Sequence, residues 1–289
     1  MTEIHTTALV SIVYLTKNGG QKFRESLNVV FSQLVDFEYE VIVVDSGSTD
    51  GTLEYVKSRP VRLYEIPPDE FNFGLTRDFG FSLANGEILI AISQDAIPVG
   101  SSWLKNITSP FKDPSVEVVQ APDVLPPTGR FFYWERIRLF SFTRESRRWI
   151  KAHNNIGLSF TGCAIRRRAW ETAHLGRVEM NEDKVFQKKI ADKGYKIVIA
   201  PDATNYHAHT YTLPSLVKRC ENEGLGWRMA DQGYSLLDML LDLVNPVILL
   251  ALIFGIITFR VRSLAELLFP VIRPIFVFKG NHFTRQFVR

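Results

Sequence analysis

Residues 40–51 of the chain read EVIVVDSGSTDG, and this stretch decides the fold. The run from Glu40 to Asp45 is apolar and β-branched between its acidic ends, which is typical of a strand buried on both faces. The small polar residues that follow it, up to Gly51, favour a turn and the start of a helix. A buried strand that leads into a helix indicates a βα unit and therefore a parallel sheet.

Similar strand runs lie on both sides of this stretch. Ala8–Leu15 (ALVSIVYL) and Glu87–Ser93 (EILIAIS) predict two further buried strands. Weaker runs predict strands at 61–66, 116–120, 157–166 and 195–200.

Helical spacing fills the intervals between these strands. Helices are predicted at 51–58, 75–84, 182–193 and 213–222. Another helix is predicted before Glu40 from apolar residues with a helical period: Phe23, Leu27, Val30, Phe31 and Leu34. Strands that alternate with helices predict an α/β fold, with a central mostly parallel sheet flanked by helices.

The composition excludes several classes of protein. The 289 residues are 46% hydrophobic and 22% charged, as in a globular protein, and the net charge of +3 is too small to indicate a nucleic-acid partner. The two cysteines, Cys163 and Cys220, are far apart, which argues against a disulfide scaffold or a structural zinc site. The polar start, Met1–Thr7, lacks the pattern of a signal peptide, so we expect the bulk of the chain in the cytosol.

The C-terminal part is more hydrophobic than the rest. Leu243–Phe259 carries no charge, and a second apolar piece, Leu264–Phe278, follows after Arg260 and Arg262. One interpretation is a buried core helix. The other is membrane contact, either as a single span or as interfacial helices with the arginines at the headgroups.

This change of composition predicts two domains. We expect an α/β domain over residues 1–235 and a membrane-associated, hydrophobic helical tail over 236–289. The tail would hold the chain at the cytoplasmic face of a membrane. Basic residues flank the apolar run on both sides, so charge does not settle its topology.

The stretch Gly129–Lys151 combines basic and aromatic residues and is predicted to be helical. Three interpretations stay open: a surface that meets anionic lipid or a lipid-linked phosphate, a sugar stacked on Tyr133 or Trp134, or an amphipathic helix with its aromatics in the core. The residues concerned are Arg130, Phe131, Phe132, Tyr133, Trp134, Arg136, Arg138, Phe140, Phe142, Arg144, Arg147, Arg148, Trp149 and Lys151.

Polar side chains follow the predicted strands at the points where they end. Thr16 follows the first strand, Asp45 ends the second, and Gln94-Asp95 follow Glu87–Ser93. Because ligands of parallel α/β sheets bind at the carboxyl ends of the strands, we expect a nucleotide pocket there. The stretch DSGSTDG also fits a strand end with a helix cap from Ser48, Thr49 or Asp50, although Asp45 itself is harder to explain as a cap. Asp95 fits either a metal ligand or a structural hydrogen bond.

Four motifs in order carry a resemblance to a known family. They are VDSGSTDGT, NFGLTRDFG, GEILIAISQDA and NEDKVFQKKIADKGYKIVIAPDATNYHAH, and residues 8–222 in all resemble the family 2 glycosyltransferases, in particular the branch with bacterial rhamnosyltransferases. The resemblance implies the GT-A nucleotide-sugar-binding fold. It implies transfer of rhamnose or another hexose from a nucleotide-diphosphate sugar, with a tilt toward thymidine diphosphate, to a lipid-linked or polysaccharide acceptor.

The resemblance also implies roles for residues around the donor. Asp45 matches the aspartate that contacts the nucleotide base, with Thr16 at the lip of the same pocket, and Arg77 matches a basic residue near the nucleotide. Asp95 matches the last acidic residue of the metal-binding motif, while Ser93 and Gln94 stand where many relatives have acids. This departure leaves one carboxylate for the divalent metal, Mg²⁺ or Mn²⁺.

Two histidines follow the strand predicted at 195–200. By resemblance, His207 completes the metal site with Asp95, and His209 is the weaker candidate. Without the resemblance, either histidine would more often be structural.

Glu182 and Asp183 match the acidic pair of the family, in which the aspartate is the catalytic base. An acceptor hydroxyl that attacks the anomeric carbon must lose a proton, and a positioned carboxylate can take it. One base acting in line implies inversion at that carbon. The alternative is that both are acidic residues in the first turn of a helix, where the helix dipole favours them.

Other functions remain to be weighed against transfer. The chain could be a catalytically impaired module that binds a nucleotide sugar or a glycan, because its metal motif is thinned. A sugar nucleotidyltransferase would open with a basic glycine-rich phosphate loop, to which TKNGGQK is a poor match. A dehydrogenase is disfavoured because no GxGxxG follows the first strand.

Overall fold

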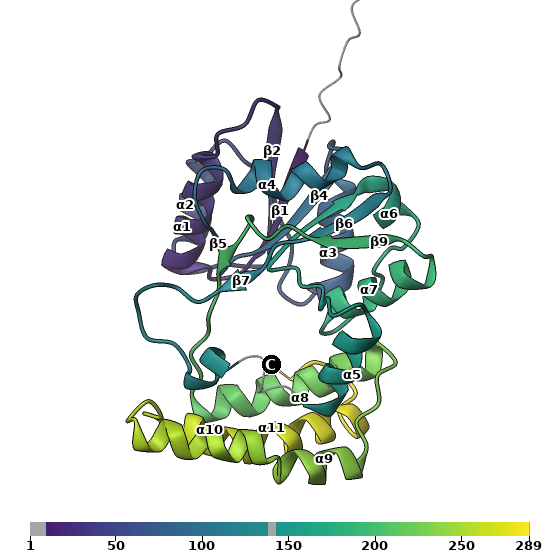
Figure 1. The fold of residues 1–289 in the computed structure, drawn as a ribbon. Helices are drawn as coiled ribbons and strands as arrows, with labels where there is room; N and C mark the ends of the chain where they lie inside the picture. The colour runs from purple at the N-terminus through teal and green to yellow at the C-terminus, as the bar shows by residue number, and fades with distance from the viewer. Residues whose placement is uncertain (1–9, 138–142, 289) are drawn as a thin grey trace, which may run out of the picture. The chain divides into compact units, whose positions relative to one another are not determined.

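The computed structural model describes residues 10–137 and 143–288. Residue contacts divide the chain into two compact units. Unit 1 comprises 1–124, 158–177 and 186–207, and unit 2 comprises 125–157, 178–185 and 208–289. Figure 1 shows a sheet with its helices in unit 1 and a set of helices in unit 2. The polar start Met1–Thr7, and the first two residues of the strand predicted at Ala8–Leu15, lie outside the described residues.

A seven-stranded sheet in the order β3-β2-β1-β4-β8-β6-β9 forms the centre of unit 1. Every neighbouring pair is parallel except those of β8, which runs antiparallel to β4 and β6. The strands are β1 Val10–Thr16, β2 Tyr39–Asp45, β3 Arg62–Glu65, β4 Ile88–Ser93, β6 Val116–Gln120, β8 Gly162–Arg166 and β9 Lys196–Ile199. The mostly parallel sheet predicted from the sequence is therefore confirmed.

Helices cover both faces of this sheet, and each face has its own hydrophobic core. The helices of unit 1 are α1 Gly20–Phe31, α2 Thr52–Lys57, α3 Phe73–Ser82, α4 Trp103–Thr108, the 3-10 turn η1 Ser109–Lys112, α6 Arg167–Glu171 and most of α7 Glu182–Asp192. One core packs α1, α2 and α4 on the sheet, for example through Phe23 and Trp103. The other packs α3, α6 and α7, for example through Phe81, Trp170 and Phe186.

Unit 1 also contains a three-stranded sheet of very short strands, which lie in the sheet in the order β5-β10-β7. Its strands are β5 Ile97–Pro98, β7 Asp123–Val124 and β10 Asn205–Tyr206. Asn205 pairs with Pro98 on one side and with Asp123 on the other. This small sheet therefore joins residues that directly follow three different parts of the central sheet.

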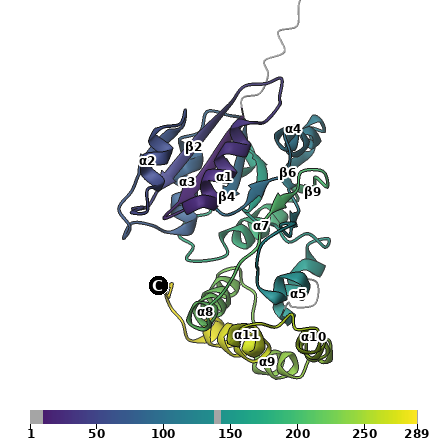
Figure 2. The ribbon, with the colours of Figure 1, turned by 90° about the vertical axis from the view of Figure 1, so that its left-hand side faces the viewer.

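Unit 2 is built from helices. They are the 3-10 turn η2 Tyr133–Ile137, α5 Arg144–Ala152, α8 Leu213–Met229, α9 Leu236–Leu243, α10 Pro246–Ile257 and α11 Leu264–His282. Figure 2 views α8 to α11 nearly end-on, and α11 packs against α8, α9 and α10. Two glycines bring α8 and α11 together, because a Cβ on Gly224 would lie 2.1 Å from the carbonyl oxygen of Val277, and one on Gly280 1.9 Å from that of Glu221.

Three sequence expectations need correction. Leu34 lies beyond the end of α1 and is 70% exposed, so it does not belong to the buried stripe of that helix. The stretch Gly129–Lys151 is not one helix, because η2 and α5 are separate elements; Arg138, Phe140 and Phe142 lie outside the described residues. The strand predicted at 157–166 begins only at Gly162, where pairing with β4 starts.

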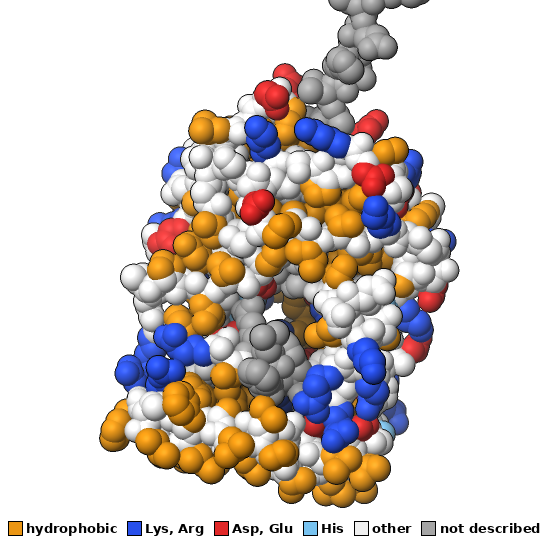
Figure 3. All heavy atoms as spheres, viewed as in Figure 1, with side chains coloured by type: hydrophobic (Ala, Val, Ile, Leu, Met, Phe, Trp, Pro, Cys, Tyr) orange, Lys and Arg blue, Asp and Glu red, His pale blue; other side chains and the backbone are white. Residues whose placement is uncertain are grey.

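The hydrophobic tail forms α9, α10 and α11, and Figure 3 shows their apolar side chains gathered along one edge of unit 2. Among the described residues, one segment, Leu236–Ile257, is long and apolar enough to cross a membrane, which is weak evidence of a span. The division of the chain at residue 235 stays a prediction. Unit 2 combines the tail with α8 and with earlier segments of the chain.

Candidate active site

The carboxyl ends of β1, β2 and β4 lie side by side in unit 1. Thr16 is paired with Asp45 across β1 and β2, and Leu15 is paired with Ser93 across β1 and β4. The side chain of Gln94 joins two of these ends, since its Oε1 accepts hydrogen bonds from Thr16 Oγ1 at 2.7 Å and from Lys17 N at 3.0 Å. Gln94 therefore holds the ends of β1 and β4 together at the edge where the strand order reverses.

Asp45 is 1% exposed and organises the turn that follows β2. Its Oδ1 accepts hydrogen bonds from the backbone N–H groups of Gly47 and Ser48, each at 2.8 Å, and Ser48 Oγ donates to its Oδ2. Gly47 has φ +90°, and a Cβ there would meet Pro68 at 2.6 Å, so the turn requires glycine. Through these bonds the Asp45 carboxylate stabilises the turn that follows it. Its contact with a nucleotide base stays a prediction.

Arg77 lies inside unit 1 on α3 and is 5% exposed. Its Nη1 is 3.4 Å from the carbonyl oxygen of Val13 in β1, and its guanidinium lies over the ring of Phe160 at 5.3 Å. These contacts anchor α3 to the sheet. The role of Arg77 beside the nucleotide stays a prediction.

Asp95 and His207 come together although 112 residues separate them in the chain. Asp95 Oδ1 lies 3.6 Å from His207 Nε2 and also accepts a hydrogen bond from Ser93 Oγ at 2.5 Å. On the other side of the ring, His207 Nδ1 lies 3.2 Å from Asp123 Oδ2. The imidazole is thus placed between two carboxylates, with 9% of its side chain exposed.

This arrangement fixes the protonation of His207. Burial by itself lowers the pKa of the imidazole, but the contacts with Asp123 and Asp95 outweigh burial and raise that pKa to about 9. Without a metal ion, His207 is therefore a cation at neutral pH. A metal ion at Nε2 would have to displace this proton.

Asp123 is the residue that the sequence reasoning missed. It belongs to β7 and accepts a hydrogen bond from Thr161 Oγ1 at 3.0 Å, which fixes the carboxylate toward His207. Its position could have indicated it, because Asp123 follows the end of β6 by three residues, and polar residues just after the strands of a parallel sheet are candidate site residues.

The residues present fit a divalent metal ion. Two ligand atoms that bind one ion at about 2.1 Å and at a right angle lie about 3 Å apart, close to the 3.6 Å between Asp95 Oδ1 and His207 Nε2. A carboxylate and an imidazole suit a first-row ion such as Mn²⁺. Asp123 orients the ring from its far side, as outer carboxylates do at many metal-binding histidines.

His209 follows His207 by two residues and belongs to unit 2, so chain length alone holds their Cα atoms within about 7 Å. Within unit 2, His209 Nδ1 lies 3.3 Å from Glu135 Oε1, and its carbonyl accepts a hydrogen bond from Phe132 N. These contacts give His209 a structural role within unit 2. Which of the two histidines binds metal stays a prediction in favour of His207.

Glu182 and Asp183 begin α7 and belong to unit 2. The turn before them needs the left-handed conformation at Asn181, which has φ 57°. Helix α8 holds this turn closely, because a Cβ on Gly226 would lie 2.7 Å from Asn181 Cγ. Glu182 is buried, while Asp183 is part-exposed and its Oδ2 lies 3.3 Å from Lys184 Nζ. Their catalytic role stays a prediction.

Comparisons with known proteins identify the family of the chain. The family model described as "Glycosyl transferase family 2" matches residues 11–173, more than half of the chain. Among curated proteins, the O-antigen chain rhamnosyltransferase RfbN of Salmonella typhimurium is 25% identical over 213 residues, covering 70% of this chain and 67% of its own. The O-antigen chain rhamnosyltransferase WbaN of Salmonella anatum is 27% identical over 215 residues, with the same shares.

Solved structures confirm the fold that the resemblance implies. The mannosyltransferase PcManGT of Pyrobaculum calidifontis, in complex with GDP-Man and Mn²⁺, has a TM-score of 0.60 at 20% identity and covers 95% of this chain and 87% of its own. Glucosyl-3-phosphoglycerate synthase of Mycobacterium tuberculosis, with Mn²⁺, UDP-glucose and phosphoglyceric acid bound, has a TM-score of 0.57 at 17% identity, with shares of 79% and 81%.

Proposed function

The chain belongs to glycosyl transferase family 2, and we propose that it is an inverting, metal-dependent enzyme that transfers a hexose to a lipid-linked or polysaccharide acceptor. The observation that carries the proposal is the group Asp95, His207 and Asp123 at the carboxyl edge of the sheet. A buried histidine between two carboxylates, beside the strand ends where nucleotides bind in such sheets, suits a metal-bound diphosphate.

The donor would lie across the ends of β1, β2 and β4. Asp45 and Thr16 are the candidates for contact with the nucleoside, because they end neighbouring strands. The similarity to two O-antigen rhamnosyltransferases supports a rhamnosyl donor, and with it a thymidine diphosphate carrier. Two similar structures hold a guanosine or uridine diphosphate sugar together with Mn²⁺, which supports a sugar nucleotide with a divalent ion as the ligand pair.

Each residue then has a distinct task. Asp95 and His207 would hold the divalent ion, which supplies positive charge to the departing diphosphate. Asp183 would accept the proton of the acceptor hydroxyl as that oxygen attacks the anomeric carbon. Glu182 is buried at the helix start beside it and would hold that turn in place. Attack from the side opposite the leaving group inverts the configuration at the anomeric carbon.

The hydrophobic tail supports an acceptor that is bound to a membrane. Helices α9 to α11 expose many large apolar side chains, which suits an enzyme that works on a lipid-linked glycan. Because the relatives named above act on O-antigen chains by their names, an anchored glycan chain is the acceptor class that we propose. The catalytic unit would lie at the cytoplasmic face of that membrane.

Calorimetric binding of UDP, dTDP and GDP, each with and without Mn²⁺, tests the donor site. We expect one nucleotide to bind tightly, and only with metal, and we expect Asp95→Ala to lose the metal requirement together with most of the affinity. Asp192→Ala, which removes an exposed carboxylate at the end of α7, is the matched control.

A turnover assay on the bound donor separates transfer from the competing interpretation of a binding module with impaired catalysis. That interpretation is supported by Gln94, which replaces an acid of the metal-binding motif and whose side chain is bonded to Thr16 and Lys17. Slow, metal-dependent hydrolysis of the bound donor without acceptor would support the enzyme. Binding of the donor without any turnover, under every metal tested, would favour the binding module.

A further inference from the structure

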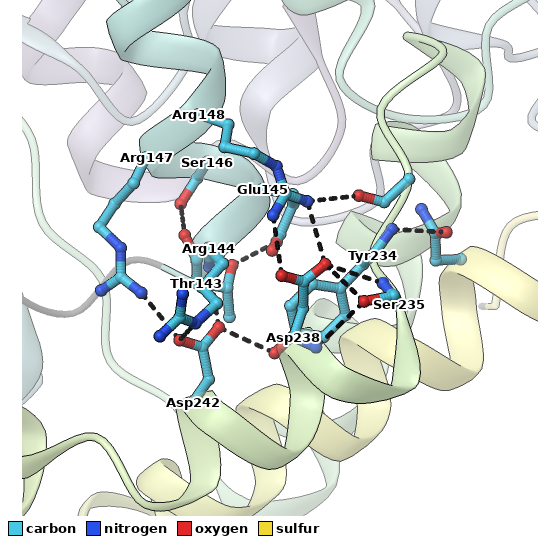
Figure 4. A network of polar contacts seen from close by, with 12 residues as sticks. Thr143, Arg144, Glu145, Ser146, Arg147, Arg148, Tyr234, Ser235, Asp238 and Asp242 are labelled. Carbon is cyan, nitrogen blue, oxygen red and sulfur yellow. Dashed lines mark hydrogen bonds and ion pairs between the residues drawn. The ribbon is translucent and has the colours of Figure 1, made fainter.

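In helix α9 the charged face packs against the protein and the apolar face is exposed, the reverse of the usual arrangement for a helix at a surface in water. Its carboxylates point into unit 2: Asp238 forms a two-pronged pair with Arg148 at 2.8 and 3.1 Å, and Asp242 pairs with Arg147 at 2.8 Å (Figure 4). The opposite side exposes a row of large apolar side chains. They are Leu236, Leu237, Leu240, Leu241 and Val244.

Helix α11 shows the same inversion. Glu266 is 4% exposed and accepts hydrogen bonds from Tyr133 N at 2.8 Å and Arg262 N at 2.6 Å. Arg273 is also buried and forms a two-pronged pair with Glu223 of α8 at 2.6 and 3.0 Å. The outward stripe, at spacings of three and four residues, consists of Leu264, Leu267, Val271 and Ile275.

Helix α10 lies between them in the chain and has no polar residue at all from Pro246 to Ile257. One stripe faces the protein, where Ala251 O accepts a hydrogen bond from Tyr133 Oη at 2.7 Å and a Cβ on Gly255 would meet the Tyr133 ring at 2.6 Å. The rest of its circumference is exposed and apolar. Those residues are Val247, Leu249, Leu250, Ile253, Phe254, Ile256 and Ile257.

Helices α9 and α11 turn their carboxylates toward the protein, α10 carries no charge, and all three expose large aliphatic side chains, so their outer face does not suit contact with water. Each exposed side chain would gain about 1 kcal/mol or more from removal to an apolar medium, and exposed apolar patches of this extent mark an interaction surface. We propose that the outer face of α9, α10 and α11, called here the platform, lies in the plane of an anionic phospholipid bilayer, at the boundary between headgroups and acyl chains.

The composition of the platform favours lipid over a protein partner. The exposed residues named above are leucine, isoleucine and valine with a single phenylalanine, whereas protein interfaces are enriched in tyrosine, tryptophan, methionine and arginine at their centre. Aliphatic side chains of this kind match acyl chains, which offer no hydrogen bonds and no shape to fit.

Arginines at the border of the platform favour a bilayer with a negatively charged surface. Arg144, Arg147 and Arg148 on α5 pack against α9 and remain 42%, 38% and 46% exposed in their side chains. At the other end, Arg260 and Arg262 follow α10 directly and are exposed. Figure 3 shows Lys and Arg side chains next to the apolar edge on both sides of this view. Such a border suits lipid phosphates at the headgroup level.

The helices lie flat instead of crossing the bilayer. Helix α10 has twelve residues and is about 18 Å long, short of the hydrocarbon core of about 30 Å. A span over Leu236–Ile257 would need α9 and α10 as one straight helix, but the helix ends at Leu243 and a new one begins at Pro246, capped by Asn245 Oδ1. Both pieces are also bound to unit 2, through the Asp238–Arg148 pair and the Tyr133–Ala251 bond.

This inference rests on the proposed transfer at a membrane for its biological setting, but its test does not use transfer. The full-length protein is mixed with vesicles of phosphatidylcholine alone or with phosphatidylglycerol, and bound protein is sedimented. We expect binding that is stronger on the anionic vesicles. The triple variant Leu250→Ser, Phe254→Ser, Ile257→Ser removes side chains that are 66%, 54% and 69% exposed and should weaken binding by about a hundredfold or more.

Two controls keep the result specific. The variant Leu34→Ser, Ile199→Ser removes exposed apolar side chains, 70% and 46% exposed, from unit 1 and should bind vesicles like the wild type. Arg260→Gln, Arg262→Gln should lose about thirtyfold in affinity on anionic vesicles and little on neutral ones. A triple variant that binds like the wild type, or a wild type that binds no vesicle and self-associates, overturns the inference.

Depth measurement separates a flat platform from a span. The native thiols, Cys163 and Cys220, are buried, so a single introduced cysteine at Leu237, Ile257 or Val271 can be labelled with a fluorophore. Quenchers at different depths should place all three labels at one level near the acyl boundary. Labels at 237 and 257 on opposite faces of the bilayer would overturn the flat arrangement. Nucleotide binding by the wild type is measured in parallel. A wild type that binds nucleotide but no vesicle contradicts the platform alone, and one that binds vesicles but no nucleotide contradicts the proposed function alone.

Discussion

Replacing Asp123 with asparagine should weaken metal binding, and the loss should grow as the pH rises. Asparagine keeps the size and one acceptor oxygen of the side chain but removes the negative charge 3.2 Å from His207 Nδ1. Loss of such an outer carboxylate costs about 10- to 100-fold in metal affinity at comparable sites. That is the loss expected once the proton no longer competes.

At lower pH the loss of metal affinity is smaller, because a proton on His207 competes with the metal ion more strongly in the wild type than in the variant. In the wild type the pKa of His207 is about 9, so metal binding at neutral pH must release about one proton, and affinity should rise about tenfold per pH unit up to that pKa. Removal of the Asp123 charge lowers the pKa of His207, since this carboxylate is a main cause of the raised value. The variant therefore competes with fewer protons, and its affinity levels off at a lower pH.

Titration calorimetry with Mn²⁺ under anaerobic conditions, at about pH 6.5 and about pH 8.5, measures both effects. Two buffers of different ionisation enthalpy give the number of protons released. We expect wild type and Asp123→Asn to differ little at the lower pH and by about tenfold or more at the higher pH, with fewer protons released by the variant. Asp192→Asn serves as the control. Equal pH slopes for Asp123→Asn and wild type would refute the account of His207 given above.

Three further predictions concern catalysis and stability. Asp183→Asn should lower the transfer rate by about 100- to 10,000-fold while donor affinity, measured by calorimetry, is kept; an active variant would show that another group is the base. Burial raises the pKa of Glu145 to about 7, so this carboxyl binds a proton in the folded state at pH values between the ordinary glutamate pKa and 7, and the protein loses stability as the pH rises through that window. In urea unfolding, Glu145→Gln should therefore be up to about 3 kcal/mol more stable than the wild type at about pH 8 and equally stable near pH 4. An equal gain at both pH values would contradict this account. Gly280→Val should lose about 3 kcal/mol in the same assay, because its Cβ would lie 1.9 Å from the Glu221 carbonyl oxygen, whereas Gly157→Ala, with its nearest contact at 3.6 Å, should be near neutral.

The sheet could be predicted because its signal is local. Runs such as VIVVD and ILIAIS are buried on both faces, so almost every residue in them is apolar, and their boundaries match β2 and β4 within one or two residues. Asp45 and Asp95 were identified for the same reason, since a carboxylate that closes such a run stands out. The helix start at Glu182 was equally clear from its acidic first turn.

The partner of His207 could not be predicted in this way. Asp123 and His207 meet because β7 and β10, of two residues each, pair with one another, and two residues carry no hydrophobic period. Their pairing depends on Gly162, where a Cβ would lie 2.2 Å from Asn205 Nδ2. Close approach of distant segments is a property of packing, and it leaves no pattern in the neighbouring sequence.

By itself, the sequence determined the α/β class, the strand ends that carry polar residues and the apolar character of the tail, since each follows from residues adjacent in the chain. Only the tertiary structure decided which way the tail helices face. The carboxylates of α9 turn inward because Arg147 and Arg148, about 90 residues earlier in the chain, are brought against them, and a carboxylate largely removed from water needs a charged partner. The leucines of α9 lie on the opposite side of the helix and therefore point outward, where they form part of the platform.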